Sequence, residues 1–214
     1  MTLLQYKVII LDFDGVLVES NAIKDKAFEA LFALYPEHLP AILDYHRSHA
    51  VIRFKKFRHI YEHILKRPYT PRIEAALNTS FSDFCVEAVI QSPEVKGARG
   101  FLEYFHGRIP LYLVSINPAE DLARILKARS LAGFFKKVYT TEGSKTGAIH
   151  DILRSENMRA SQTVFIGDSS GDYQSARQAG VFFIGRQAQQ DFKANDFPLF
   201  NNMSEILDFL CEVK

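Results

Sequence analysis

Five short, largely apolar runs constrain the fold of this chain more than any other feature of its sequence. They are Lys7–Leu11, Leu111–Val114, Val138–Thr140, Thr163–Ile166 and Val181–Ile184. Such runs are typical of strands buried on both faces of a parallel sheet. Helical patterns alternate with them at Gly97–His106, Pro118–Leu131, Lys145–Glu156 and Gly171–Gln178, and a closing helix is expected at Ser204–Glu212. The alternation predicts an α/β fold with a doubly wound parallel sheet, a Rossmann-like core.

A long segment separates the first two predicted strands, although a single crossover helix needs far fewer residues. Residues 20–92 have helical periodicity and almost no strand pattern, and prolines such as Pro36 and Pro68 mark helix boundaries within them. We therefore expect an α-helical cap at residues 19–93, inserted into a catalytic core of residues 1–18 and 94–214. The linkers are expected near 16–20 and 92–97.

The charge of the chain is balanced, with 26 lysines and arginines against 25 aspartates and glutamates. No global basic field favours nucleic acid, so we expect no nucleic-acid partner. No apolar stretch approaches the length that spans a bilayer, and residues 1–7 lack a secretory signal pattern, so no membrane association is expected. Cys85 and Cys211 have no paired spacing and are expected to be reduced. These features predict a cytoplasmic protein.

Two carboxylates follow the first predicted strand, at Asp12 and Asp14. Side chains two residues apart on an extended chain point the same way, here at the carboxyl end of a parallel strand, where open α/β sheets bind ligands. Ionised carboxylates this close repel each other, so a bound cation or a shared proton is expected. A capping or turn role explains one of these residues but not both.

A second acidic group, Asp168 and Asp172, follows the fourth predicted strand. Alone, Asp168 or Ser169 could simply cap the next helix. Together with the first pair, the group favours a site for a hard cation with carboxylate oxygens as ligands. Magnesium commonly takes one or two carboxylates and completes its octahedron with water and substrate phosphate.

Two further segments suit a phosphate group. Ser115 ends the second predicted strand and is followed by Asn117, and this hydroxyl and the nearby amides are expected to hold phosphate oxygens. A surface helix cap is the alternative interpretation. Lys145 opens the helix after the third strand, where a positive charge opposes the helix dipole unless an anion compensates it.

These segments together resemble the motifs of the haloacid dehalogenase superfamily. The motifs are DFDGV at residues 12–16, a strand ending in Ser115, Lys145, and GDSSGD at residues 167–172, and they occur in the order that the family has. The helical insertion is similar to the class I cap of the phosphoglycolate phosphatase and phosphosugar mutase branch. Thr146 follows Lys145 where many relatives have proline, and Ile116 separates Ser115 from Asn117.

The resemblance implies a role for each matching residue. Asp12 is the nucleophile that forms an aspartyl-phosphate, and Asp14 protonates the leaving oxygen and later activates water. Mg²⁺ is the implied cofactor. Its implied ligands are Asp12, the backbone carbonyl of Asp14, Asp168, and Asp172 through water. Ser115 and Lys145 hold the transferring phosphoryl group, with Gly15 and Asn117 among the substrate-binding residues.

Asp14 also separates the branches of this family. Dehalogenases lack the second aspartate because a halide leaving group needs no proton, so its presence here favours phosphoryl transfer from a small phosphorylated metabolite. A phosphosugar mutase on the same core remains an alternative. A non-catalytic binding or regulatory protein is the alternative from another class, and the complete set of acidic residues argues against it.

Three other patterns have competing interpretations. Gly167–Gly171 matches a serine-hydrolase nucleophile elbow, but the last histidine, His150, precedes Ser169, and the required histidine would follow it. His59 and His63 match a zinc-binding pattern and are better interpreted as solvated histidines on an amphipathic helix.

The third pattern is the segment 46–59, which contains five lysines or arginines and no acid. A solvated surface and a nucleic-acid patch are two possible interpretations, and the second lacks support from the net charge. The hypothesis that goes furthest places Arg53, and also His49, in contact with an anionic or hydroxyl-rich substrate.

Overall fold

The computed structural model describes residues 6–49, 51–188, 192 and 196–212, so part of the predicted core range 1–18 lies outside the described residues. Six parallel strands form one sheet in the order β3-β2-β1-β4-β5-β6. They are β1 Val8–Leu11, β2 Leu111–Ser115, β3 Lys137–Thr140, β4 Thr163–Gly167, β5 Phe182–Arg186 and β6 Leu199–Phe200. This order confirms the doubly wound α/β core, in which the strand order reverses between β1 and β4.

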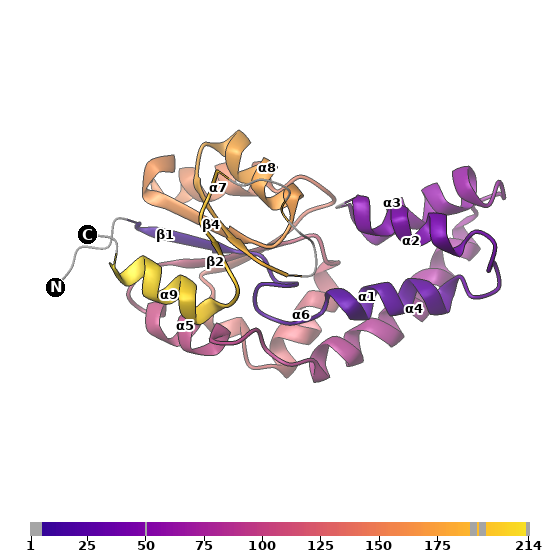
Figure 1. Ribbon diagram of the computed structural model, residues 1–214, viewed down its shortest axis with the longest axis horizontal. Helices are drawn as coiled ribbons and strands as arrows, with labels where there is room; N and C mark the ends of the chain where they lie inside the picture. Colours follow the sequence, from indigo (N-terminus) through magenta and orange to yellow (C-terminus); the bar gives the residue numbers. More distant parts are fainter. Residues whose placement is uncertain (1–5, 50, 189–191, 193–195, 213–214) are drawn as a thin grey trace.

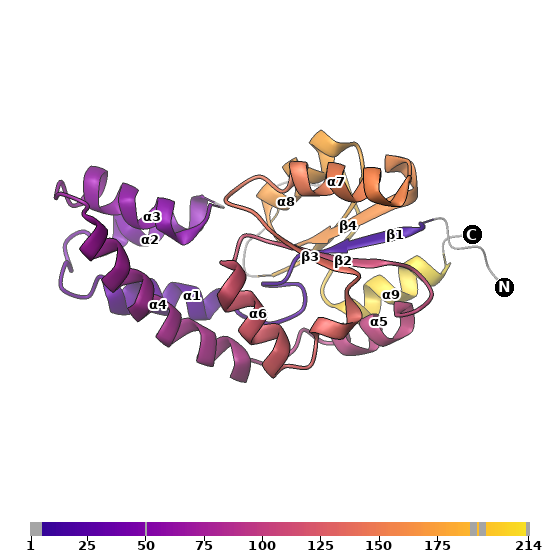
Figure 2. The ribbon, with the colours of Figure 1, turned by 180° about the vertical axis from the view of Figure 1, so that it is seen from behind.

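Helices cover both faces of the sheet (Figures 1 and 2). One face carries α5 Ala98–Phe105, α6 Ala119–Ala128 and α9 Met203–Glu212, and the other carries α7 Thr146–Glu156 and α8 Ser170–Ala179. Short 3₁₀ turns at Ala132–Phe134 and Ala160–Gln162 precede β3 and β4.

Strand β1 shows why this arrangement forms. All four of its residues are buried, and alternate side chains join different hydrophobic cores. Ile9 and Leu11 pack with α5, α6 and α9, whereas Val8 and Ile10 pack with α7 and α8. A strand that is apolar on both faces is stable only when both faces are covered.

Most of the segment between β1 and β2 forms a helical insertion to one side of the sheet (Figure 1). It contains α1 Asn21–Leu31, α2 Leu39–Ser48, α3 Arg53–His59, a π-helical turn at Ile60–Ile64 and α4 Pro71–Gln91. Its aromatic core, centred on Phe28, Phe32, Phe57 and Phe81, is separate from the two cores of the sheet. The insertion is therefore a packed unit of its own.

The two chain segments that join the insertion to the sheet lie side by side. The amide of Glu19 donates to the carbonyl of Pro93 at 3.1 Å, and that of Val95 donates to the carbonyl of Leu17 at 3.0 Å. Arg129, on the core side, donates to three carbonyls at the end of α4. These bonds fix where the insertion leaves the core. No helix in the described ranges is long and apolar enough to cross a membrane.

Candidate active site

The acidic residues meet at the point where the strand order reverses. Asp12 follows β1 and Asp168 follows β4, and these strands are paired neighbours, with Leu11 opposite Ile166. The structure thus brings together the two acidic groups, which are far apart in the sequence. Both residues line a cavity of about 890 Å³ that extends from the sheet to the helical insertion.

Asp12 is buried and held by Lys145, the residue that precedes α7. The Lys145 ammonium lies 2.7 Å from Asp12 Oδ1 and 2.7 Å from Asp172 Oδ1, and the amide of Phe13 also donates to Asp12 Oδ1 at 2.7 Å. Burial is the largest influence on Asp12 and raises its pKa to about 7; Lys145 opposes it, while Asp172 and Asp14 add to it. Burial lowers the pKa of Lys145, but Asp12 and Asp172 outweigh it, so the ammonium stays charged.

The carboxylates of Asp12, Asp168 and Asp172 form a group that fits a divalent cation. One oxygen from each lies within 4.8 Å of the others, and all three residues are buried. Burial, and then the charges of Asp12 and Asp172, raise the pKa of Asp168 well above its usual value. If all three carboxylates were ionised, they would carry two more negative charges than the single ammonium of Lys145 neutralises. All-oxygen donors of this kind suit magnesium.

Asp14 belongs to a separate network that reaches into the insertion. Its carboxylate forms an ion pair with Lys24 of α1 and accepts hydrogen bonds from Ser20 and from the Asn117 amide, the latter at 2.7 Å. Burial raises the pKa of Asp14, but Lys24, Ser20 and Asn117 together hold this pKa below its usual value. Asp14 is therefore ionised in this arrangement.

Ser20, Asn21 and Lys24 also belong to these two networks and were not among the site residues predicted from the sequence. Asn21 Nδ2 donates to Asp168 Oδ2 at 2.7 Å, and Lys24 Nζ donates to Asn117 Oδ1 at 3.0 Å. These residues have the spacing i, i+1, i+4, and a helix places residues three and four apart on one face, so this polar pattern shortly after DFDGV was the available signal.

Other residues of the predicted site lie around these two networks. Ser115 is fully buried, and its hydroxyl accepts a hydrogen bond from the amide of Asn117 at 3.1 Å. Gly15 has a φ of +69°, and a Cβ there would lie 1.9 Å from Asp168 Oδ2. Asp172 also caps α8, because its amide and carboxylate both bond to Ser169. Asp172 therefore belongs both to the cap of α8 and to the group of carboxylates that fits a cation.

Arg53 and His49 both line the cavity, on its helical side. The Arg53 guanidinium is engaged by protein groups: it pairs with Asp121 of α6 and donates to Asn78 and Ser82 of α4, both at 2.7 Å. His49 is exposed and stacks on Tyr45 with ring centroids 4.2 Å apart. Substrate contact by either residue remains a prediction.

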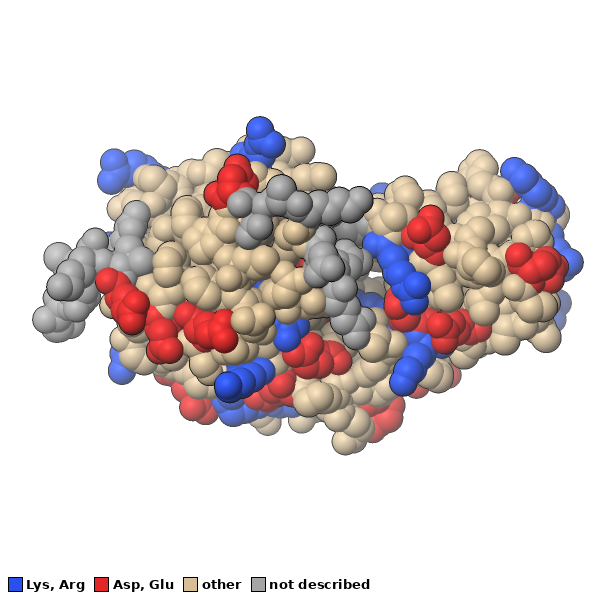
Figure 3. All heavy atoms as spheres, in the orientation of Figure 1, with Lys and Arg blue, Asp and Glu red and all other residues tan. Residues whose placement is uncertain are grey.

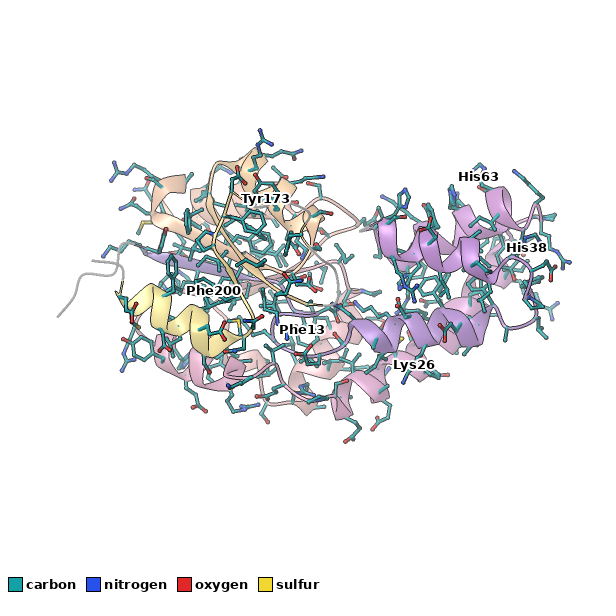
Figure 4. All side chains as sticks on the ribbon, viewed as in Figure 1. Phe13, Lys26, His38, His63, Tyr173 and Phe200 are labelled. Carbon is teal, nitrogen blue, oxygen red and sulfur yellow. The ribbon has the colours of Figure 1, made fainter. Side chains whose placement is uncertain are left out.

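His59 and His63, the residues of the zinc-like pattern, have no third metal ligand beside them among the described residues. His63 lies at the end of the insertion farthest from the sheet (Figure 4). Within the described part of the chain, the acidic group at the sheet is the one place where three suitable ligand atoms converge. Figure 3 shows acidic and basic side chains interspersed on this face, without a broad basic patch.

Fold and site together define a doubly wound α/β protein with a carboxylate and lysine centre at its topological switch point. A family model described as haloacid dehalogenase-like hydrolase matches residues 9–186. The chain therefore belongs to the haloacid dehalogenase-like hydrolase family, and the resemblance inferred from the motifs is confirmed.

Solved structures share this fold across nearly the whole chain. A predicted phosphoglycolate phosphatase from Haemophilus somnus has 16% sequence identity and a TM-score of 0.75, covering 96% of this chain and 98% of its own. The HAD-like protein YfnB from Bacillus subtilis, bound to magnesium, has 18% identity and a TM-score of 0.74, with coverage of 96% and 99%. A predicted β-phosphoglucomutase from Thermotoga maritima has 18% identity and a TM-score of 0.72, with coverage of 97% and 100%. No curated protein matches the sequence.

Proposed function

We propose that the protein is a magnesium-dependent phosphatase that hydrolyses a small organic phosphomonoester through an aspartyl-phosphate on Asp12. The observation that supports this most directly is the division of the acidic residues into two networks. Asp12 shares Lys145 with Asp172, whereas Asp14 is paired separately with Lys24. This division supports nucleophilic attack by Asp12 and proton transfer by Asp14.

The reaction has two halves. In the first, a carboxylate oxygen of Asp12 forms a bond to phosphorus, the ester P–O bond breaks, and Asp14 gives a proton to the leaving alcohol. In the second, water attacks the phosphorus, Asp14 accepts its proton, and inorganic phosphate leaves the restored Asp12. The contact with Lys24 favours ionised Asp14, the form that accepts a proton from water in the second half. The first half needs protonated Asp14, so this contact would have to be released when the substrate binds.

The remaining core residues hold the phosphoryl group. Lys145 neutralises charge on its oxygens, and Ser115 and Asn117 donate hydrogen bonds from the end of β2. Gly15 leaves room for Asp168 beside the site. Magnesium, bound by Asp12, Asp168 and Asp172, would supply Lewis-acid stabilisation of the transferring group.

The helical insertion is proposed to act as a cap, with boundaries at residues 19–93. Asp14 bonds to Lys24 of α1, so movement of the insertion would change the site directly. The magnesium-bound structure of YfnB is described as revealing interdomain movement. Closure of the cap would exclude water from the site. It would also bring cap residues, including Arg53 and His49 as predicted, into contact with the substrate.

Cys85 and Cys211 are free, in keeping with a cytoplasmic location.

Turnover of an aryl phosphate tests this proposal. We expect hydrolysis with Mg²⁺, none in excess EDTA, and poor substitution by Ca²⁺, whose looser coordination disturbs in-line geometry. Full activity in EDTA would overturn the metal requirement.

The structural similarity to a predicted β-phosphoglucomutase keeps a mutase as the second candidate. Release of inorganic phosphate from a sugar phosphate, rather than an isomeric sugar phosphate, separates the two.

A further inference from the structure

The helical side of the cavity is richer in cations than in acids. Its lining includes Lys24, Arg47, Arg53 and Lys56, against Asp25 and Asp44. Three of the cations have carboxylate partners: Lys24 pairs with Asp14, Arg53 with Asp121, and Arg47 with Asp25. Among the described residues, no carboxylate forms a direct ion pair with Lys56, and both of its hydrogen-bond contacts are to His46.

Lys56 is nevertheless buried and held in a defined position. Its side chain belongs to α3 and is part of a residue only 7% exposed. The ammonium donates to the carbonyl of His46 at 2.6 Å and lies 3.1 Å from His46 Nδ1. The Phe28 ring is 5.9 Å away on the same side, in cation–π range.

His46 is oriented so that it accepts a hydrogen bond from the ammonium of Lys56. Its Nε2 lies 3.2 Å from Asp25 Oδ1, and its ring stacks on Phe28 with centroids 3.9 Å apart. A carboxylate at this distance favours the tautomer with the proton on Nε2, which leaves Nδ1 as the acceptor for the ammonium. Two of the three ammonium protons of Lys56 are thereby used, and the third has no acceptor among the described residues.

This arrangement is costly without an anion. Burial is the main effect that lowers the pKa of Lys56 to about 7, and the charge of Lys24 lowers it further. Asp25 acts in the opposite direction but is shared with Arg47 and His46. A buried charge is stabilised when an opposite charge with hydrogen-bonding oxygens reaches it.

We propose that Lys56, oriented by His46, binds an anionic group at the non-reacting end of the substrate. The enzyme then prefers phosphomonoesters that carry a second anion, either a carboxylate or a second phosphate. This inference rests on the proposed phosphatase activity, since the core end of the same cavity would hold the reacting phosphoryl group. Lys24, by contrast, is committed to Asp14 and Asn117, and Arg53 to three protein acceptors.

Three series of synthetic substrates test the inference. They are ω-carboxyalkyl phosphates, α,ω-alkanediol bisphosphates and neutral ω-hydroxyalkyl phosphates, each with two to six carbons as a rough match to the cavity. We expect wild-type kcat/KM to be about tenfold to a hundredfold higher for one anionic series at its best length than for the neutral series, the scale of one charged hydrogen bond. The better anionic series identifies the source of the charge.

The variant Lys56→Met keeps the length of the side chain and removes its charge. It should lose the preference for the anionic series while its kcat/KM for the neutral series changes by about twofold or less, and Lys56→Arg should keep part of the preference. Lys26→Met is the matched control, because Lys26 is an exposed lysine on the outer side of α1 (Figure 4). The control should retain the wild-type preference.

Each remaining outcome is decisive. If wild-type protein hydrolyses neutral and anionic series equally, the anion site is wrong while the phosphatase remains. If no series is hydrolysed and an aryl phosphate with Mg²⁺ is also untouched, the proposed function itself fails. Equal losses by Lys56→Met on all three series would assign Lys56 a structural role. If Lys56→Met does not fold, Lys56→Gln replaces it as the uncharged variant. The comparison of anionic and neutral series with the wild-type protein still tests the anion site.

Discussion

At the scale of single residues, substitutions of Asp12 and Asp14 are expected to reduce turnover in different ways. Asp12→Asn keeps the shape of the side chain but removes the nucleophilic anion, so kcat should fall by several orders of magnitude with every substrate. Asp14→Asn should impair alkyl phosphates strongly and aryl phosphates less, because an activated leaving group departs without a proton. Steady-state kinetics on both substrate types measure this. Near-normal turnover by Asp12→Asn would rule out covalent catalysis at this residue.

Gly15 allows a direct test of the proposed metal site, because the chain contains a second glycine with a similar φ that can serve as a control. Gly15 and Gly107 have φ values of +69° and +75°, so alanine at either should cost about 1 kcal/mol of stability or somewhat more. Only the Cβ at position 15 would collide with Asp168, whereas nothing lies within 4 Å of a Cβ at position 107.

We therefore expect both glycine variants to have lower melting temperatures. Gly15→Ala alone should need more Mg²⁺ for half-maximal activity. Circular dichroism melts and magnesium titrations of activity measure the two effects separately. An unchanged magnesium requirement in Gly15→Ala would argue against Asp168 as a ligand.

The core residues of the site could be predicted from sequence because each directly follows a recognisable strand or begins a helix. Asp12 and Asp168 needed only the rule that parallel strands present their carboxyl ends together. Lys24, Asn21 and Lys56 could not be placed in this way. Their roles depend on how the insertion packs over the sheet, and a helical pattern in the sequence does not specify this packing.

At the scale of elements, the five predicted strands are present with shifts of one or two residues at their ends. Strand β6 was not predicted, because two residues, Leu199 and Phe200, give no periodicity. The π-helical turn at Ile60–Ile64 could not be predicted from the sequence either, because it reflects a local change of hydrogen bonding within a continuous helical pattern.

The ion pair between α3 and α6 is the main charged connection that we expect to hold the insertion near the core. Arg53 and Asp121 are both buried, and Ser82 of α4 bonds to each of them. Removing one partner leaves a buried charge, so Arg53→Met or Asp121→Asn should each cost about 3 kcal/mol of unfolding free energy. The double variant should cost less than the sum.

Denaturant unfolding of the two single variants and the double variant gives the coupling energy, expected at about 1 to 3 kcal/mol. Arg154→Ala is the control, because its pair with Asp151 is solvent-exposed and should be nearly neutral. Additive losses would mean that Arg53 and Asp121 do not stabilise one another. Loss of kcat/KM without loss of stability would favour the predicted substrate contact of Arg53.

At the scale of the whole molecule, the structure keeps like charges together where a cation is expected. The overall charge is balanced, yet three buried carboxylates lie together at the sheet, where Lys145 forms ion pairs with two of them. This local excess lowers stability when no metal is bound. Mg²⁺ at a hundredfold excess over its dissociation constant should stabilise the protein by about 2.7 kcal/mol, which corresponds to roughly 5 to 10 °C in melting temperature for a chain of this length.

The size of this stabilisation should depend on pH. The pKa of Asp12 is raised to about 7, and that of Asp168 is raised as well, so the folded protein without metal takes up protons that the unfolded chain, with ordinary carboxyl pKa values, does not bind. These two groups therefore stabilise the metal-free protein less as pH rises through 7. Protons and Mg²⁺ compete for the same oxygens, so the stabilisation by Mg²⁺ should grow from pH 6 to pH 8.

The melting temperature with Mg²⁺ minus that with EDTA, measured at pH 6, 7 and 8, gives this dependence free of other titrating groups. His46 is one such group: burial, aided by Lys56, lowers its pKa to about 2, so it destabilises the folded protein below pH 6.5 whether or not metal is present. Taking the difference removes its contribution. Asp168→Asn should show a smaller stabilisation by Mg²⁺ with a flatter pH profile, because it lacks one of the competing carboxylates. A stabilisation by Mg²⁺ that stays constant from pH 6 to 8 in the wild type would place the cation away from Asp12 and Asp168.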